Sequence, residues 1–189
     1  MSLGRGGQPR GGVVTDSSGS RGSFNRRVNG IEDLIAIEEI RQLVHRYAMA
    51  VDGKDFDGIV SLFAEDVDAG AAGRGREALR TVYQGRLADT ELSILSIANL
   101  VVEFEGPSRA TGAVYCRCET SIGGEWVIQQ ILYRDAYERH DGTWYFRRRE
   151  HLLFYGAPLG VSPLGLAPCS GHEYGLGRGT APGRLPHLR

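Results

Sequence analysis

Tyr47-Ala-Met-Ala-Val-Asp52 and Tyr133-Arg-Asp-Ala-Tyr-Glu-Arg-His-Asp-Gly-Thr-Trp144 are the two stretches that indicate the fold most clearly. The first stretch ends an apolar stripe at helical spacing that begins at Ile31, and Gly53 follows it as a helix stop. The second stretch indicates two long strands joined at Asp141-Gly142, a strong hairpin signal. Together they predict an α+β domain in which a helix carrying a phenol and a carboxylate packs on an antiparallel sheet.

The rest of the chain keeps this order of helices first and strands afterwards. Asp55 is suited to cap a second helix, and residues 77–87 return to helical spacing. Four strand-like segments then follow one another, with glycine-containing turn signals between them, at 94–104, 110–122, 126–139 and 143–155. We therefore expect about three N-terminal helices packed on one face of a curved, mostly antiparallel sheet.

The chain divides into three parts by composition. Residues 1–30 hold eight glycines and five arginines without periodicity, which predicts a disordered Gly/Arg-rich extension. Residues 31–155 form the predicted domain. Residues 156–189 hold eight more glycines and five of the seven prolines, which predicts a Gly/Pro-rich tail.

Composition limits the classes of function. The 189 residues are 41% hydrophobic and 24% charged, as in an ordinary globular protein, and the net charge of −1 argues against a nucleic-acid binder. No apolar run is long enough for a membrane span, and the N-terminus lacks the apolar region of a secretory signal. Cys116 and Cys118 share one strand face at a spacing unsuited to a disulfide, so a cytoplasmic setting is expected.

Neither a metal nor a cofactor is expected. Cys116-x-Cys118 and Cys169-x-x-His172 each lack the second ligand pair of a zinc site. Gly73-x-Gly75 does not follow a buried strand within a βαβ unit, so it does not match a dinucleotide fingerprint.

These features resemble the NTF2-like superfamily, and within it the SnoaL-like group of polyketide cyclases, scytalone dehydratase, ketosteroid isomerase and bile-acid dehydratases. The resemblance covers residues 31–155. It rests on Tyr47 and Asp52, Phe63-Ala-Glu-Asp66, Asn99, Tyr133-x-Asp135-x-Tyr137 and Asp141-Gly-Thr-Trp144. It implies a cone-shaped barrel that holds a small hydrophobic ligand, and a homodimer formed through the sheet.

The resemblance places Tyr47 and Asp52 in the pocket, and their chemistry suits an acid–base pair. A carboxylate at a helix C-terminus faces the negative end of the dipole, and burial adds to this effect, so both raise its pKa. Asp52 is therefore the candidate base, and the Tyr47 phenol can stabilise a developing enolate. Since five residues turn a side chain by about 140° on a helix, Asp52 reaches the same cavity only if the helix ends near Gly53.

The last strand supplies the remaining candidates. His151, Arg149 and Arg147 share strand parity with Tyr145. If that face lines the cone, either arginine could hold an anionic oxygen and His151 could relay a proton; the sequence leaves the inward face open. The other residues expected to contact substrate are Asn99, Tyr133 and Asp135, although Asp135 could equally pair with Arg117 or Arg134 on the sheet surface.

Two functions fit these residues. The first is a cofactor-independent lyase, isomerase or cyclase that uses general acid–base catalysis on a hydrophobic, oxygenated ring compound of polyketide or steroid type. The second is a non-catalytic ligand-binding or dimerisation protein, or an accessory subunit of a larger enzyme. Leu95 favours the second, because many dehydrating relatives carry a histidine there, four residues before the asparagine that Asn99 matches.

Overall fold

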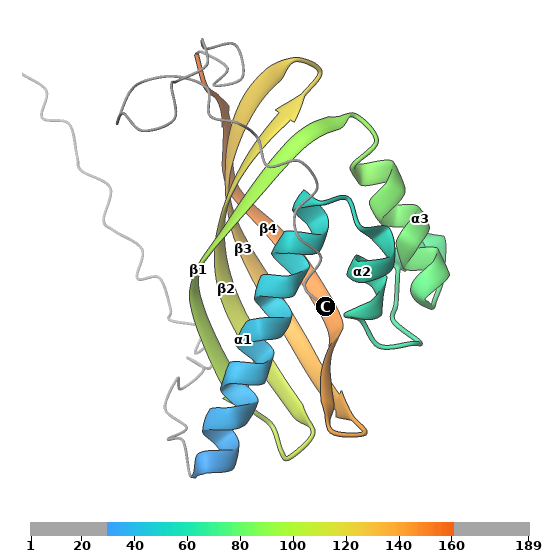
Figure 1. Cartoon of the computed structure of the whole chain (residues 1–189), viewed down its shortest axis with the longest axis vertical. Coiled ribbons are helices and arrows are strands. Elements are labelled where there is room, and N and C mark those ends of the chain that lie inside the picture. Colours follow the sequence, from blue (N-terminus) through green and yellow to red (C-terminus); the bar gives the residue numbers. More distant parts are fainter. Residues whose placement is uncertain (1–29, 161–189) are drawn as a thin grey trace, which may run out of the picture.

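Residues 30–160, described by the computed structural model, form an α+β fold in which helices come first and strands afterwards (Figure 1). All but residue 30 of the predicted extension at 1–30 and most of the predicted tail at 156–189 lie outside the described residues. The helices are α1 (Ile31–Asp52), α2 (Phe56–Ser61), the short 3-10 helix η1 (Gly70–Ala72) and α3 (Arg76–Arg86), and the strands are β1 (Thr90–Phe104), β2 (Arg109–Ile122), β3 (Glu125–His140) and β4 (Thr143–Pro158).

Helix α1 follows the predicted apolar stripe and ends where the sequence predicts. Gly53 caps it with an N–H bond of 3.0 Å to the Met49 carbonyl, but Gly53 keeps right-handed geometry at φ −79°. The left-handed residue is Lys54, at φ 49°, so the reversal comes one residue later than a typical glycine stop. Asp55 then caps α2 as predicted, accepting a hydrogen bond of 2.9 Å from the Gly58 N–H.

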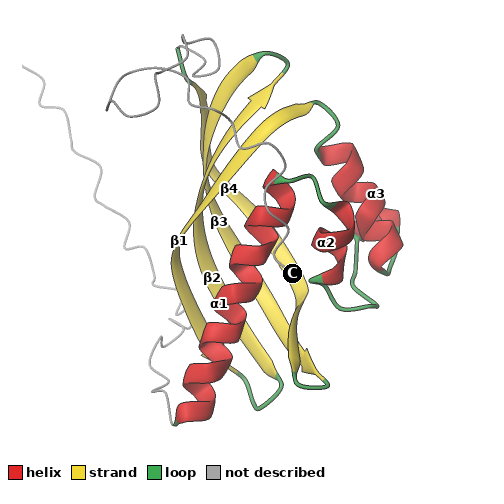
Figure 2. Cartoon of the chain, viewed as in Figure 1, coloured by secondary structure: helices red, strands yellow, loops and turns green. Residues whose placement is uncertain are grey.

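The four strands form one antiparallel sheet in the order β1-β2-β3-β4, with the helices on one side of it (Figure 2). The predicted hairpin between β3 and β4 is confirmed, because Asp141 and Gly142 both have positive φ, at 49° and 82°, as a type I′ turn requires. The α+β class and the three helices on an antiparallel sheet are thus confirmed, whereas the cone shape stays a prediction.

The segment after α2 extends the sheet at its β4 edge. The Phe146 N–H donates to the Leu62 carbonyl at 2.9 Å, and the Ala64 N–H donates to the Phe146 carbonyl at 3.0 Å. Phe63 therefore runs parallel to β4 and packs its ring 5.0 Å from that of Phe146. This contact ties the segment that follows α2 to β4 and brings Asp66 alongside that strand.

The core lies between the helices and the inner face of the sheet. Alternation along β2 buries Val114, Cys116 and Cys118 while the residues between them face outward. From α1 the same core receives Ile40, Val44 and other members of the apolar stripe. Among the helices of residues 30–160, none is long and apolar enough to cross a membrane.

Candidate functional site

Strand β4 delivers an arginine into the core through a β-bulge. Tyr137 pairs with Phe146 and Ala136 pairs with Arg148, so Arg147 is an extra residue without an opposite partner on β3. A bulge shifts the alternation by one position, and both Phe146 and Arg149 consequently face the helices. The predicted shared face of Arg147 and Arg149 is therefore wrong, because a plain alternation does not allow for the bulge.

Arg149 forms a buried ion pair with Asp135 of the neighbouring strand β3. Its Nε donates to Asp135 Oδ1 at 2.8 Å and its Nη2 donates to Oδ2 at 2.6 Å. The two side chains are 3% and 0% exposed, respectively. The Tyr137 hydroxyl also donates to Asp135 Oδ2, at 2.7 Å. Asp135 thus pairs inside the core with Arg149 and not with Arg117 or Arg134 on the sheet surface.

Three aromatic rings surround the Arg149 guanidinium. Its central carbon lies 4.3 Å from the ring centroids of Tyr47 and Tyr133 and 4.2 Å from that of Phe146. Burial opposes the charged form, but the adjacent Asp135 carboxylate outweighs it and holds the pKa of Arg149 above its usual range. The guanidinium is therefore permanently charged, and cation–π contacts add to its ion pair. We call Arg149, Asp135 and these three rings the arginine cage.

Tyr47, which lies on α1, connects the arginine cage to helix α3. The Tyr83 hydroxyl donates a hydrogen bond of 3.0 Å to the Tyr47 oxygen. Burial raises the pKa of both phenols, so both carry their protons at neutral pH. With its oxygen accepting from Tyr83, the Tyr47 hydroxyl keeps its own proton to donate to another group.

Asp52 lies at the end of α1 in a separate polar setting. Its carboxylate accepts from the Leu95 backbone N–H at 3.1 Å and from Ser93 Oγ at 3.1 Å, both on the edge strand β1. Burial raises the pKa of Asp52, and these two hydrogen bonds lower it by a smaller amount. In the described part of the chain, no hydrogen bond joins Asp52 to Tyr47, so the predicted pair does not form a direct contact.

Two cysteines of β2 lie near Asp52 on the inner face. Burial raises the pKa of Cys116 to about 11 and that of Cys118 to about 12, with smaller contributions from the charge of Asp52. Arg149 also acts on the pKa of Cys116, in the opposite direction. Cys116 thus lies close enough to both Asp52 and Arg149 for their charges to act on its thiol. Both cysteines are free thiols.

The remaining predicted site residues take other positions. His151 is an exposed residue, but its ring packs 5.6 Å from Tyr133 and partial burial lowers its pKa. Asn99 is exposed at an irregularity of β1 between Ile97 and Leu100, where pairing with β2 shifts register. His151 therefore borders the arginine cage, whereas Asn99 lies outside it.

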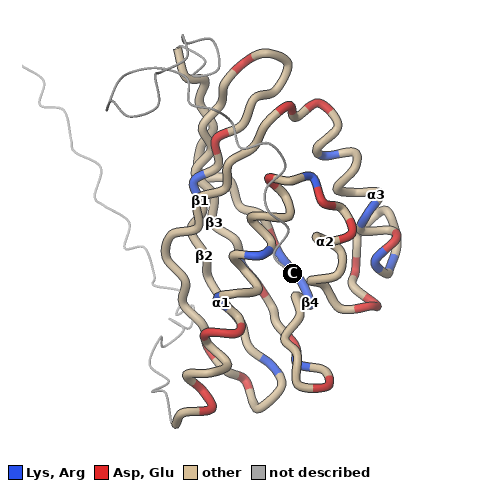
Figure 3. Tube along the Cα trace, viewed as in Figure 1, with Lys and Arg blue, Asp and Glu red and all other residues tan. Residues whose placement is uncertain are grey.

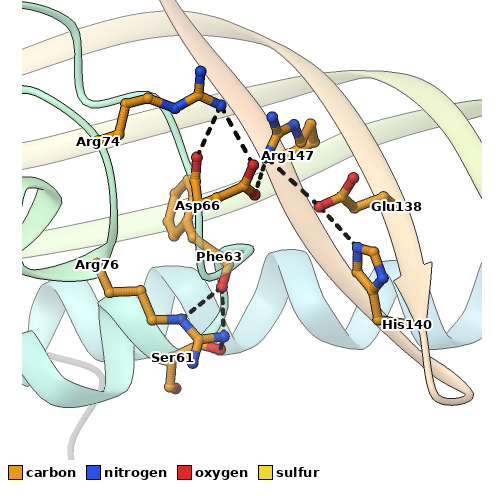
Figure 4. A network of polar contacts seen from close by, with 8 residues as sticks. All are labelled: Ser61, Phe63, Asp66, Arg74, Arg76, Glu138, His140 and Arg147. Carbon is orange, nitrogen blue, oxygen red and sulfur yellow. Dashed lines mark hydrogen bonds and ion pairs between the residues drawn. The ribbon is translucent and has the colours of Figure 1, made fainter.

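Arg147 belongs to a different network, at the outer edge of β4 (Figure 4). It forms an ion pair with Asp66, which also receives Arg74 at 3.3 Å, and it approaches Glu138 at 3.9 Å. His140 contacts the same Glu138 at 3.0 Å. A hollow of about 280 Å³ beside Arg147 is lined by charged residues, including Glu138, and by the uncharged Ala110, Ala136 and Tyr137. We call Arg147, Asp66, Glu138, Arg74 and His140 the surface network.

Tyr83 and Cys116 lie at the site but were not predicted from the sequence. Tyr83 follows Leu79 at the i, i+4 spacing of one helix face, and both are buried, so this spacing was the available signal. Cys116 was considered only as a disulfide or metal ligand. Among residues 30–160, no three histidine, cysteine or carboxylate side chains gather in a way that could hold a metal.

Comparison with protein families gives one match over most of the described residues. The family described as SnoaL-like domain matches residues 32–150. No curated protein sequence matches the chain.

Solved structures share the fold at low sequence identity. A hexachlorocyclohexane dehydrochlorinase (LinA, type 2) has a TM-score of 0.64 and 23% identity, covering 71% of this chain and 98% of that one. LinA-type3 from Novosphingobium barchaimii has a TM-score of 0.61 and 24% identity, over 68% and 93%. A candidate scytalone dehydratase from Novosphingobium aromaticivorans has a TM-score of 0.60 and 20% identity, over 69% and 92%. At these identities the likeness extends to the fold and not to a reaction.

Proposed function

The chain belongs to the SnoaL-like domain family, and on this premise we propose that it is a cofactor-independent lyase, isomerase or cyclase. Its substrate would be a hydrophobic, oxygenated ring compound that binds on the inner face of the sheet, between Asp52 and the arginine cage. The observation that carries the proposal is that one inner face of the sheet holds a partly buried carboxylate of raised pKa and, without direct contact to it, a buried phenol and guanidinium. Structural neighbours that include a dehydrochlorinase and a candidate dehydratase are consistent with such chemistry.

Asp52 would act as the general base. Burial moves its pKa toward the range in which a carboxylate can take a proton from carbon and later return it. In the proposed step, the carboxylate removes a proton from the carbon next to a substrate carbonyl; the C–H electron pair forms a C=C bond to the carbonyl carbon, and the C=O π pair moves onto the oxygen to give an enolate. Reprotonation elsewhere, attack on a second carbonyl, or loss of a leaving group would then complete isomerisation, cyclisation or elimination, respectively.

Tyr47 would stabilise the enolate oxygen. Tyr83 donates to the Tyr47 oxygen, which leaves the Tyr47 proton for the substrate and makes that proton a better donor. Arg149 stacks against the Tyr47 ring and adds positive charge where negative charge develops. Donors that are fixed in advance within a core of low polarity stabilise such charge more strongly than water does.

A second candidate function is a non-catalytic ligand-binding protein. It is favoured by one observation: the Asp52 carboxylate is engaged by the Leu95 N–H and by Ser93. These bonds tie the end of α1 to β1, which is a structural task that requires no catalysis. Leu95 also occupies the position at which a proton-relaying histidine was expected by resemblance.

Comparing wild type with Asp52→Asn separates the two functions. Both proteins would be incubated with a panel of hydrophobic ring ketones and alcohols, with thermal stability as the binding readout and mass spectrometry and NMR as product readouts. Asp55→Asn is the matched control, since Asp55 caps α2 and asparagine caps a helix equally well. We expect product from wild type and Asp55→Asn and none from Asp52→Asn. Full turnover by Asp52→Asn would refute the role of Asp52, and stabilisation of all three proteins without product would favour the binding protein.

We further propose that two copies pair through the outer face of the sheet. Tyr115 and Phe154 are 39% and 58% exposed there, with ring centroids 5.8 Å apart, and Val101 is 44% exposed nearby. Exposed aromatic and aliphatic side chains on one face favour association with a complementary surface. Light scattering should give the mass of a dimer for wild type and that of a monomer for Tyr115→Lys. A monomeric wild type would contradict the proposal.

A further inference from the structure

Arg149 is positioned as a ligand-binding cation, yet its charge is already balanced. Asp135 takes two of its donor nitrogens in a bidentate pair, and the two side chains are 3% and 0% exposed. A bidentate carboxylate meets one of the two guanidinium edges that a substrate carboxylate or phosphate could use. Asp135 thus occupies the Nε–Nη2 edge of Arg149 and balances its charge.

One nitrogen of Arg149 remains available. Its Nη1 is buried and has no hydrogen-bond partner among the described residues. Leaving a buried donor of a charged group unpaired is costly, so such donors normally meet an acceptor. Tyr47, Tyr133 and Phe146 surround the guanidinium with ring faces, which supply cation–π contact but no strong acceptor.

Among residues 30–160, the other buried ionisable groups around the cage add no positive charge. Tyr47, Tyr83, Tyr133 and Tyr137 are buried phenols whose pKa is raised by that burial, so they are neutral. The thiols of Cys116 and Cys118 are protonated for the same reason, and His151 has a lowered pKa. In the described part of the chain two further charges act on these groups: Asp52, which is negative and whose hydrogen-bond partners, Ser93 and Leu95, are uncharged, and Arg86 of α3, an exposed cation whose charge acts on Tyr47, Tyr83 and His151. Because Arg86 is solvated at the surface, the buried part of the site carries no net positive charge.

We propose that Asp135 makes Arg149 selective for neutral ligands. Nη1 donates a hydrogen bond to a single acceptor atom of the ligand, such as a carbonyl or ether oxygen, and carboxylates, phosphates and sulfates do not bind. An added anion would be a buried charge without a counter-charge, which is strongly unfavourable. This inference rests on the proposed ligand site and names its substrate class. It also replaces the expectation that Arg149 holds an anionic oxygen in the ground state; negative charge would develop there only during reaction.

The first test removes the internal anion. In Asp135→Ala a space opens beside Arg149, and we expect formate to raise the melting temperature of this variant but not that of wild type. Formamide, of the same size but neutral, and sodium chloride at equal ionic strength should have little effect. Asp66→Ala is the matched control, since it removes the anion partner of Arg147 from the exposed surface network. If Asp135→Ala does not fold alone, the recovery of native circular dichroism on refolding with formate replaces the melting temperature as the readout.

The second test compares ligands of equal shape. Cyclohexyl methyl ketone and cyclohexanecarboxylate would be titrated into wild type and followed by NMR of the arginine side-chain N–H groups. We expect the ketone to bind at least about tenfold more tightly, a difference of about 1.4 kcal/mol. Both tests read binding and not turnover, so they stand even if Asp52 proves not to be a base. The proposal is overturned if formate stabilises wild type as much as Asp135→Ala, if formate leaves Asp135→Ala unaffected, if the carboxylate binds wild type as tightly as the ketone, or if neither ligand reaches Arg149.

Discussion

Arg147 and Arg149 lie two residues apart on β4, in the run of basic residues along the middle of that strand (Figure 3), and they have opposite surroundings. The Arg149 side chain is 3% exposed and pairs with a fully buried Asp135, whereas Arg147 is 34% exposed and pairs with an Asp66 that is 66% exposed. The bulge at Arg147 separates them. Desolvation, and not the count of ion pairs, therefore determines what each arginine contributes to stability and to binding.

The largest expected effect is that of breaking the arginine cage. Arg149→Met should lower the free energy of unfolding by about 3–5 kcal/mol, because Asp135 is left buried without its counter-charge. Urea denaturation followed by circular dichroism measures the change. The double variant Arg149→Met with Asp135→Leu should recover most of this loss, since it leaves no unpaired buried charge. A single variant as stable as wild type would contradict the view that the cage depends on its ion pair.

A smaller effect is expected from the backbone behind the cage. A Cβ at Gly112 would lie 2.8 Å from Tyr137 Cε2 and 3.0 Å from its hydroxyl, too close for the ring to keep its place. Gly112→Ala should therefore displace Tyr137 from Asp135 and cost about 1–3 kcal/mol of unfolding free energy. Gly156→Ala is the matched control on β4, because its Cβ would meet no atom closer than 3.7 Å. Equal losses from both variants would show that Tyr137 is not the cause.

Some elements of the fold are predictable from the sequence, whereas the different surroundings of Arg147 and Arg149 are not. Helix α1, the Asp55 cap and the hairpin at Asp141 follow from local patterns of spacing, capping and turn chemistry, and the structure confirms them. The position of Arg149 does not, because it depends on a bulge that has no glycine or proline to mark it. The parallel contact of Phe63 with Phe146 beside that bulge joins residues distant in sequence, and single-sequence patterns do not report such contacts.

The candidate site shows the same limit at the level of side chains. Tyr47, Tyr133, Asp135 and Arg149 were expected near substrate, and they do come together in the structure. Their mutual arrangement was not predictable, since the Asp135–Arg149 pair depends on the register between β3 and β4. Tyr83 is a core position by its helical spacing, and only the packing of α3 against α1 turns it into a partner of Tyr47.

Asp52 extends the comparison of the two arginines to a partly buried carboxylate that forms no ion pair within residues 30–160. Its effect on stability depends on pH. Burial raises its pKa in the folded state above that in the unfolded chain, so the folded state binds the proton more tightly. The stability of wild type relative to Asp52→Asn should therefore fall as pH rises from the ordinary aspartate range through the raised pKa, and then stay constant. Denaturation curves of both proteins over this pH range measure the difference. A relative stability that rises with pH would mean that the hydrogen bonds from Ser93 and Leu95 outweigh burial.

The smallest effect is expected from the surface network, which closes the comparison. Arg147→Gln removes the ion pair with Asp66, but both groups are solvated and Asp66 keeps its contact with Arg74. Exposed pairs gain little because water and salt screen them and because ordering the side chains costs entropy. The unfolding free energy should thus stay within experimental error of wild type, at low and at high salt. A loss as large as that of Arg149→Met would mean that Arg147, as the extra residue of the bulge, also holds the register that turns Arg149 inward. Arg147→Lys would then show whether the charge is what holds the register, because it keeps the positive charge that Arg147→Gln removes.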